Sequence, residues 1–331
     1  MKKLTVGGLF AGIGGIELGF EQAGFQTLWA NDADKYSSKT YRLNFSNPFI
    51  EKDIYDLNGK DLDPVDILAG GFPCQPFSVA GYRKGFDDER GNLFYEIIRI
   101  VNELKEKPKI LFLENVKNLY THDKGNTYAT IEKEIKKLGY SVFTKILNTS
   151  EYTHIPQNRE RTFIICFKDE LDWEKNSAIT TSRKFSERFP PEKYNDTEHI
   201  SFFYEKGKID NKYYYGEEKY MFNELSESIK SKDTIYQWRR IYVRENQNGQ
   251  CPTLTANMGT GGHNVPLILV DDGIRKLTPR ECFNFQGYPK TYKLPEDVPN
   301  SQLYKQAGNS VTVPLIKRLA ETIKESMISL I

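Results

Sequence analysis

The chain has 331 residues, of which 38% are hydrophobic and 13% aromatic, so it can bury a large core and is not a disordered protein. Four cysteines in that length are too few for a disulfide framework, and their spacing fits no metal site. No apolar run is long enough for a membrane span, so we expect a cytoplasmic protein with reduced thiols. The net charge of +1 by itself argues against a nucleic-acid partner.

Apolar strand-like runs alternate with helix-like runs through the first half of the chain. Strands are predicted at residues 4–10, 25–30, 65–69, 110–113, 140–147 and 161–167. Helices are predicted from residue 16 up to Gly24, and at 34–45, 93–104 and 127–138. Strands that alternate with helices in this way predict an α/β fold with a mostly parallel sheet.

The pattern changes after Lys168. Residues 168–250 hold clustered aromatic and charged side chains without a clear period, which predicts a second, smaller and less regular domain. Residues 305–327 return to an apolar pattern, interpreted as a strand followed by a helix that rejoins the large sheet. We therefore expect a discontinuous large domain at 1–185 and 300–331, and a small domain with a hinge at 186–299.

A glycine-rich turn separates the first predicted strand from the first helix. The run Phe10-Ala11-Gly12-Ile13-Gly14-Gly15 lets a ligand approach backbone N–H groups at a helix N-terminus. Asp32 ends the next strand, where an acid can bind ribose hydroxyls. These features predict a nucleoside-containing cofactor, the alternative being a tight turn without a ligand. A nicotinamide cofactor is disfavoured because Gly15 directly follows Gly14.

Three more polar segments adjoin predicted strands. Cys74 lies in a loop rich in Gly and Pro after the strand at 65–69, so it is either a nucleophile or a small packed residue. Glu114 directly follows an apolar strand and is either an active-site acid or a surface residue. The run Gln157-Asn158-Arg159-Glu160-Arg161, taken alone, favours a solvated charged segment.

In their order, these segments resemble the cytosine-5 DNA methyltransferases of bacterial restriction–modification systems. The resemblance rests on 10–15, Pro73-Cys74-Gln75, Glu114-Asn115-Val116, 157–161 and Gln306-Ala307-Gly308-Asn309-Ser310-Val311, with Arg280-Glu281-Cys282 and Gly287-Tyr288-Pro289 as a further block. The matching blocks span nearly the whole chain. They imply a Rossmann-like methyltransferase domain that uses S-adenosylmethionine, at 1–185 and 300–331. They also imply a small target-recognition domain at 186–299.

The resemblance implies a cofactor site and requires no metal. The expected cofactor contacts are Phe10, Ile13, Gly15, Asp32, Ala33, Asp53, Ile54, Pro73, Leu93, Asn309, Ser310 and Val311. Asp32 would take the ribose, and Asp53 with Ile54 the adenine. The chain departs from the family at Gly8, where an acid is usual, and at Ala33, where a bulky residue over the adenine is common. Both departures bear on how tightly the cofactor binds.

The implied catalytic residues are Cys74, Glu114, Arg159 and Arg161. Addition of the Cys74 thiolate to cytosine C6 makes C5 nucleophilic, and the thiol later leaves. Glu114 at N3 and Arg161 at O2 would stabilise the charge that develops on the base. Arg159 would support the thiolate or the neighbouring backbone.

The target base must leave the duplex to react, so residues 77–90 are expected to form a lid over it. The expected DNA contacts are Ser78, Gln237, Arg239, Arg240, Arg244, Thr253 and Leu254. Gln237 would fill the gap left by the base, and Arg240 would bind a guanine. The expected target is a short palindrome with CC and GG ends.

Three other functions were weighed against this one. A nicotinamide-dependent oxidoreductase leaves the Cys74 and Glu114 segments unexplained. A tRNA cytosine-5 methyltransferase shares most motifs but typically carries Cys-Phe-Thr, where the nearest string here is Cys282-Phe283-Asn284. A non-catalytic DNA-binding relative would not need Cys74, Glu114 and Arg161 intact.

Double-stranded DNA is the expected partner. A cognate restriction endonuclease would be a functional partner, and we expect a monomer with no membrane contact. Residues 275–318 hold eight Lys and Arg against three Asp and Glu, so a local basic strip rather than the whole surface would meet the phosphates.

Overall fold

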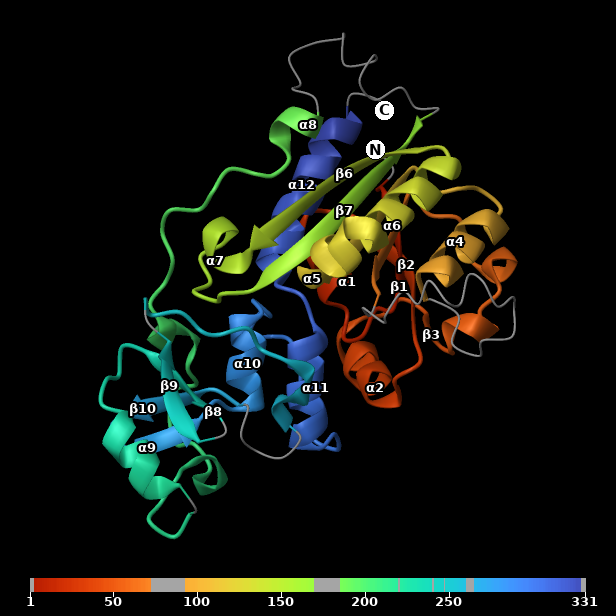
Figure 1. Ribbon diagram of the computed structural model, residues 1–331. Coiled ribbons are helices and arrows are strands. Elements are labelled where there is room, and N and C mark those ends of the chain that lie inside the picture. Colours follow the sequence, from red (N-terminus) through yellow and green to blue (C-terminus); the bar gives the residue numbers. More distant parts are fainter. Residues whose placement is uncertain are drawn as a thin grey trace. The chain divides into compact units, whose positions relative to one another are not determined.

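A computed structural model describes residues 3–72, 93–169, 185–219, 221–239, 241–246, 248–259 and 265–328. The chain forms two compact units (Figure 1). The first unit comprises 1–147, 160–192 and 316–331, and the second comprises 148–159 and 193–315. These bounds differ from the predicted domains chiefly at 148–159 and 300–315. Segment 148–159 joins the second unit because its backbone bonds there: Asn158 N donates to Cys251 O, and Cys251 N donates to Pro156 O.

The first unit is built on a seven-stranded sheet with the order β3-β2-β1-β4-β5-β7-β6. Its strands are β1 (Thr5–Leu9), β2 (Gln26–Asp32), β3 (Phe49–Glu51), β4 (Ile67–Gly71), β5 (Ile110–Val116), β6 (Tyr140–Asn148) and β7 (Glu160–Lys168). The pairs from β3 through β5 are parallel, and β7 runs antiparallel to β5. The predicted α/β fold with a mostly parallel sheet is confirmed.

Helices cover both faces of this sheet, since alternate residues of each strand point to opposite sides. They are α1 (Gly15–Gln22), α2 (Lys35–Asn44), α4 (Leu93–Glu103), α5 (Asn118–Thr121), α6 (Asn126–Lys137), α8 (Phe185–Arg188) and α12 (Val313–Ile328). One face buries Leu111 and Leu113 of β5 in a cluster with α4 and α6. On the other face, Phe112 packs edge-on against Phe20 of α1. Burial on both faces explains why the central strands are apolar runs without alternation.

The second unit contains more regular structure than the sequence predicted. Its elements are α7 (Thr149–Tyr152), α9 (Phe222–Ser228), β8 (Ile235–Arg239), β9 (Tyr242–Asn246), β10 (Leu267–Val270), β11 (Gly273–Lys276), α10 (Pro279–Phe285) and α11 (Asn300–Asn309). The strands form an antiparallel sheet of order β11-β10-β8-β9. The strands are only four or five residues long, which is too short for the alternation of apolar and polar residues to stand out from the surrounding loops.

The end of the chain corrects one expectation. Residues 305–327 were predicted to form a strand followed by a helix, whereas the structure shows the end of α11 followed by α12. Helix α12 does return to the first unit, where Ile316 packs so closely on Gly19 of α1 that a side chain at Gly19 would not fit. Among the described residues, no helix is long and apolar enough to cross a membrane.

Candidate active site

The turn between β1 and α1 is open toward a ligand. Phe10, Gly12 and Gly14 all have positive φ, with values of 53°, 55° and 81°. A side chain on Gly12 would meet no atom within 4 Å, so the backbone there borders open space. Ile13 is buried beneath the turn and Phe10 is half-buried against the core. The N–H groups of Gly12 and Gly14 donate to Asp32 and to Ala11 O, so the turn offers a ligand the open space beside Gly12 at the start of α1.

The carboxylate of Asp32 lies beside this turn. One oxygen accepts a hydrogen bond from Gly12 N at 2.8 Å, and the other accepts one from Asp34 N at 2.8 Å. Burial raises the pKa of Asp32, and the Asp34 and Gly12 N–H groups oppose that shift. The Ala33 N–H group also donates to Asp32, and because a carboxylate has about four acceptor positions, Asp32 can still accept a bond from one ribose hydroxyl.

The other cofactor residues predicted in the first unit lie at the ends of neighbouring elements. Ala33 is exposed directly after β2. Asp53 is exposed and accepts a hydrogen bond from Tyr55 N at 3.1 Å, while the Ile54 side chain is buried. Leu93 begins α4 and is half-buried against the core. No bulky side chain at position 33 can cover an adenine.

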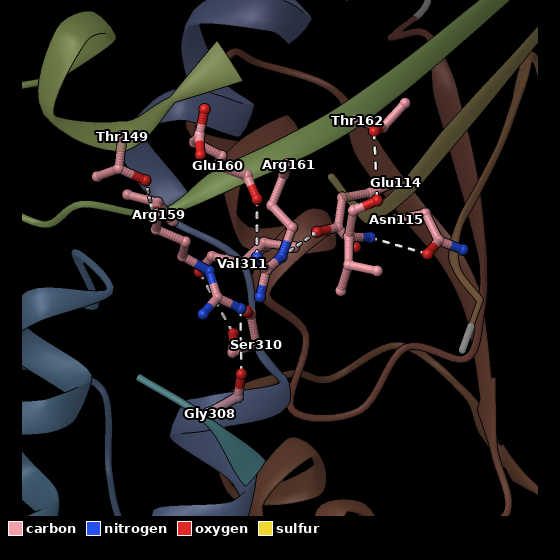
Figure 2. Close-up of polar contacts among 12 residues, drawn as sticks. Glu114, Asn115, Thr149, Arg159, Glu160, Arg161, Thr162, Gly308, Ser310 and Val311 are labelled. Carbon is pink, nitrogen blue, oxygen red and sulfur yellow. Dashed lines mark hydrogen bonds and ion pairs between the residues drawn. The ribbon is translucent and has the colours of Figure 1, made fainter. Parts of the chain in front are cut away.

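Glu114 and Arg161 form an ion pair where β5 and β7 run side by side. The Arg161 Nε lies 3.0 Å from a Glu114 oxygen, and the two side chains keep 15% and 10% of their surface exposed (Figure 2). Arg161 also donates to the carbonyl oxygen of Glu160 at 2.8 Å. Burial lowers the pKa of the Arg161 guanidinium, and the Glu114 charge opposes this. The structure thus brings the two residues together as a pair, which the sequence alone did not predict.

This pair lies at the end of β4, the strand that leads into the predicted nucleophile loop. Gly71 stands opposite Glu114 in the sheet, and a side chain added to Gly71 would lie 3.2 Å from the second Glu114 oxygen. The Asn115 side chain donates to Phe72 O at 2.8 Å and so fixes the last described residue of this segment. Pro73, Cys74, Ser78 and the predicted lid at 77–90 lie outside the described residues.

Arg159 has a different environment from Arg161, although only one residue separates them. It is 1% exposed within the second unit, and its guanidinium donates to Leu254 O at 2.8 Å and to Gly308 O at 3.1 Å. It also donates to Ser310 O (Figure 2). Arg159 therefore ties together three backbone carbonyls from two segments that are distant in the sequence.

The cofactor residues predicted near the C-terminus lie at the end of α11 and directly after it, in the second unit. Asn309 is exposed, whereas Ser310 and Val311 are buried. The Ser310 hydroxyl bonds the Tyr288 hydroxyl at 2.6 Å. This contact joins the Gly287-Tyr288-Pro289 block to the Ser310 segment.

The predicted DNA contacts on the β8–β9 hairpin are unevenly exposed. Gln237 is 8% exposed and accepts a hydrogen bond from Arg239 at 3.0 Å, so its side chain is buried and held in place by its neighbour on β8. Arg239 and Arg244 are exposed. Arg240 lies outside the described residues. The most exposed large apolar side chain is Ile241, at 87%, and its neighbour Tyr242 is 58% exposed; sequence reasoning did not single out either one.

The other two predicted DNA contacts lie in the structure as packing residues. The Leu254 side chain is fully buried, so it cannot contact DNA in this conformation. Thr253 is partly buried and donates its hydroxyl hydrogen to Asn158 O at 2.6 Å. Together with Arg159, these residues hold segment 148–159 against the loop after residue 250.

The remaining thiols and acids do not form a second reactive centre in the part of the chain that the structure describes. Cys166, Cys251 and Cys282 are unpaired and buried, and burial raises the pKa of each thiol well above its ordinary value. No cluster of His, Cys, Asp and Glu suited to a metal occurs among the described residues. Sequence reasoning missed Glu17, a fully buried acid on α1.

A mostly parallel sheet with a glycine turn after β1, an acid at the end of β2, and an acid–arginine pair beside the end of β4 is the arrangement expected of an enzyme that uses a nucleoside cofactor. The model of the C-5 cytosine-specific DNA methylase family matches residues 4–325. The chain is 50% identical over 328 residues to the type II methyltransferase M.Bsp6I of Bacillus sp. (strain RFL6), covering 98% of this chain and 100% of that protein. The chain therefore belongs to the C-5 cytosine-specific DNA methylase family.

Other relatives agree. M.HhaI of Haemophilus parahaemolyticus, a type II methyltransferase, is 38% identical over 336 residues, which cover 96% of this chain and 94% of that protein. The crystal structure of the S. pombe Dnmt2 methyltransferase superposes with a TM-score of 0.72 at 18% identity. That match covers 99% of this chain and 98% of the other, and it shows the shared fold.

Proposed function

We propose that this enzyme methylates carbon 5 of a cytosine in double-stranded DNA, with Cys74 as nucleophile and S-adenosylmethionine as methyl donor. The observation that carries the proposal is the Glu114–Arg161 pair beside the end of β4. From that strand the chain continues into Pro73-Cys74-Gln75. The target-recognition role is assigned to the region at 186–299 and the catalytic role to the rest of the chain.

The chemistry divides among the side chains as follows. The Cys74 thiolate forms a bond to C6 of cytosine, and the electron pair of the C5–C6 double bond moves toward N3 and O2. Glu114 donates a proton or hydrogen bond to N3, and the Arg161 charge stabilises O2. After C5 has gained the methyl group, it loses its proton, and the bond from C6 to the Cys74 sulfur breaks. Arg159 acts by holding the backbone carbonyls around Ser310.

The residues around the β1–α1 turn fit the proposed cofactor. The open backbone at Gly12 can accept a ligand without a steric clash, and Asp32 keeps an acceptor position for a ribose. Asp53 and Ile54 would adjoin the adenine, with Phe10, Ile13, Gly15, Pro73, Leu93, Asn309, Ser310 and Val311 as further contacts. When bound, S-adenosylmethionine supplies the methyl group that C5 takes.

The exposed arginines of the β8–β9 hairpin support DNA recognition by the second unit. Arg239 and Arg244 present guanidinium groups that can bind guanine or phosphate. The buried Gln237 and Leu254 do not support side-chain contacts with DNA. A target with CC and GG ends, and a cognate endonuclease from which the methylation protects the host, complete the proposal.

Methyl transfer to unmethylated plasmid DNA, measured with S-adenosylmethionine labelled in the methyl group, tests the proposal. Cys74→Ala should abolish turnover, because the thiols that the structure describes are all buried, while DNA binding is retained. Cys166→Ala is the matched control and should keep turnover, since that thiol is sealed in the core of β7. Turnover in Cys74→Ala equal to that of the wild type would remove Cys74 as the nucleophile.

A further inference from the structure

The carboxyl group of Glu17 occupies the space that a side chain at position 8 would take. Gly8 lies near the carboxyl end of β1, and a Cβ atom built on it would fall on a Glu17 oxygen. Glu17 belongs to the first turn of α1, two residues after Gly15. The acid that is missing from the strand at position 8 is therefore matched by an acid that reaches the same place from the helix.

Glu17 is a costly residue to keep in this position. Its side chain is 1% exposed, and its Oε2 has no hydrogen-bond partner among the described residues. The pKa of Glu17 is raised to about 8, chiefly by burial, and the charges of Glu21 and Asp32 contribute to this rise. A buried acid that lacks a partner is destabilising, so its presence needs a compensating role.

The groups around Glu17 do not neutralise it. Glu21 on the same helix and Asp32 at the end of β2 are both acidic, and Tyr41 on α2 is a neutral phenol. Helix α12, which packs on Gly19, carries Lys317 and Lys324. Lys317 pairs with Glu321 on its own helix, and Lys324 donates to Ala23 O. Among the described residues, the charge that Glu17 can carry is therefore without a cationic partner from the protein.

We propose that the ionised Glu17 carboxyl provides, from α1, the negative charge that complements a cationic group of S-adenosylmethionine. This proposal rests on the proposed cofactor, whose sulfonium and ammonium groups are both positive. The second observation that points to a ligand is the open backbone at Gly12, in the same turn from which α1 begins. Glu17 thus acts as a charge-complementing residue of the cofactor site.

The proposal fixes the sign of a pH effect. In the protein without cofactor, Glu17 is mostly protonated at neutral pH because its pKa is about 8. A bound cation favours the ionised form and lowers that pKa, so binding releases a proton. Cofactor affinity should then rise with pH below about 8 and level off above it, with a limiting slope of about tenfold per pH unit.

Isothermal titration calorimetry of the full chain with S-adenosylmethionine, between pH 6.5 and 8.5, tests this directly. The Kd of the wild type should fall about 15-fold from pH 6.5 to 8, with proton release shown by the dependence of the binding heat on the buffer. Glu17→Gln, which keeps the shape, should bind more weakly at pH 8 and should lose the pH dependence. Glu21→Gln, one turn further along α1, is the matched control and should keep it.

The results separate two failures. If the wild type binds no S-adenosylmethionine at any pH, the proposed cofactor is wrong, and this proposal falls with it. If the wild type binds but Glu17→Gln shows the same affinity and pH profile, only the role of Glu17 is refuted. The product S-adenosylhomocysteine lacks the sulfonium charge. If its affinity does not depend on pH, the group that Glu17 complements is the sulfonium. If its affinity depends on pH as that of S-adenosylmethionine does, the group is the ammonium.

Moving the carboxyl group from position 17 to position 8 gives a second test that does not depend on one variant. Gly8→Asp alone should lower the thermal stability, because its carboxyl would collide with that of Glu17. Gly8→Asp combined with Glu17→Ala restores one carboxyl in the same space and should recover cofactor affinity relative to Glu17→Ala alone. A folded double variant that binds no better than Glu17→Ala would contradict the proposed location of the charge.

Discussion

One arginine–glutamate pair of the first unit and one of the second are built differently. In the first unit, Arg161 reaches Glu114 through Nε at 3.0 Å, and both side chains remain partly exposed. In the second unit, Arg275 makes two hydrogen bonds to Glu281 at 2.7 and 2.6 Å, and the side chains are 2% and 0% exposed. The two pairs therefore differ in their exposure to solvent as well as in their hydrogen-bond geometry.

The surroundings explain the contrast. Both oxygens of Glu281 have further donors, from Thr278 N at 2.8 Å and Glu205 N at 2.9 Å, and a capping box places the residue at the start of α10. Such a pair fixes a fold. The Glu114 carboxyl instead lies over Gly71, which has no side chain. Gly71 ends β4, just before the segment that contains the proposed nucleophile Cys74. A pair that stays accessible can act on a base.

The largest effect on stability is expected from breaking the buried Arg275–Glu281 ion pair. Arg275→Met should lower the free energy of unfolding by about 3–5 kcal/mol, since it leaves the Glu281 charge buried without its partner. Urea denaturation measures this. Lys232→Met removes an exposed ion pair with Asp271 in the same unit and should leave the denaturation midpoint unchanged. Equal urea denaturation midpoints for Arg275→Met and the wild type would show that the Arg275–Glu281 pair does not stabilise the fold.

Glu114→Gln should have the opposite profile. The single-turnover rate of methyl transfer should fall about 10²–10³-fold, because the amide cannot protonate N3, while the unfolding midpoint changes little. Glu160→Gln is the control, as Glu160 is an exposed partner of Lys117 on the neighbouring strand. If both variants turned over at the wild-type rate, Glu114 would not be the acid.

The smallest effect is expected at the hairpin tip. Ile241 lies between the exposed Arg239 and Arg244, an arrangement typical of apolar side chains that enter DNA grooves. Ile241→Ala should reduce kcat/KM for plasmid DNA about tenfold, equivalent to about 1.4 kcal/mol. Phe202→Ala removes another exposed apolar side chain, at 65%, elsewhere in the same unit and should have no effect. An unchanged kcat/KM for Ile241→Ala would place the DNA contact elsewhere.

The first unit was largely predictable from the sequence. Its strands are continuous apolar runs that end at polar residues, so Asp32 and Glu114 could be assigned to strand ends before the structure was known. The pairing of Glu114 with Arg161 required tertiary information, because it depends on β7 lying antiparallel to β5.

Other features could not be predicted for physical reasons. The short strands of the second unit give little periodicity, and the apolar residues before α12 continue a helix rather than a strand. The roles of Arg159 and Leu254 follow from one buried set of backbone hydrogen bonds between distant segments. The only sequence signal for Glu17 was the missing acid at Gly8, and that signal could be interpreted only once the helix lay over the strand.

Bisulfite sequencing of plasmid DNA from a host that lacks cytosine methylation, and that expresses this protein, tests the central claim most directly. The account predicts cytosines that resist conversion within one short palindromic sequence, on both strands, and full conversion when Cys74→Ala is expressed instead. Complete conversion of every cytosine in the presence of the folded wild-type protein would contradict the assignment as a DNA cytosine-5 methyltransferase.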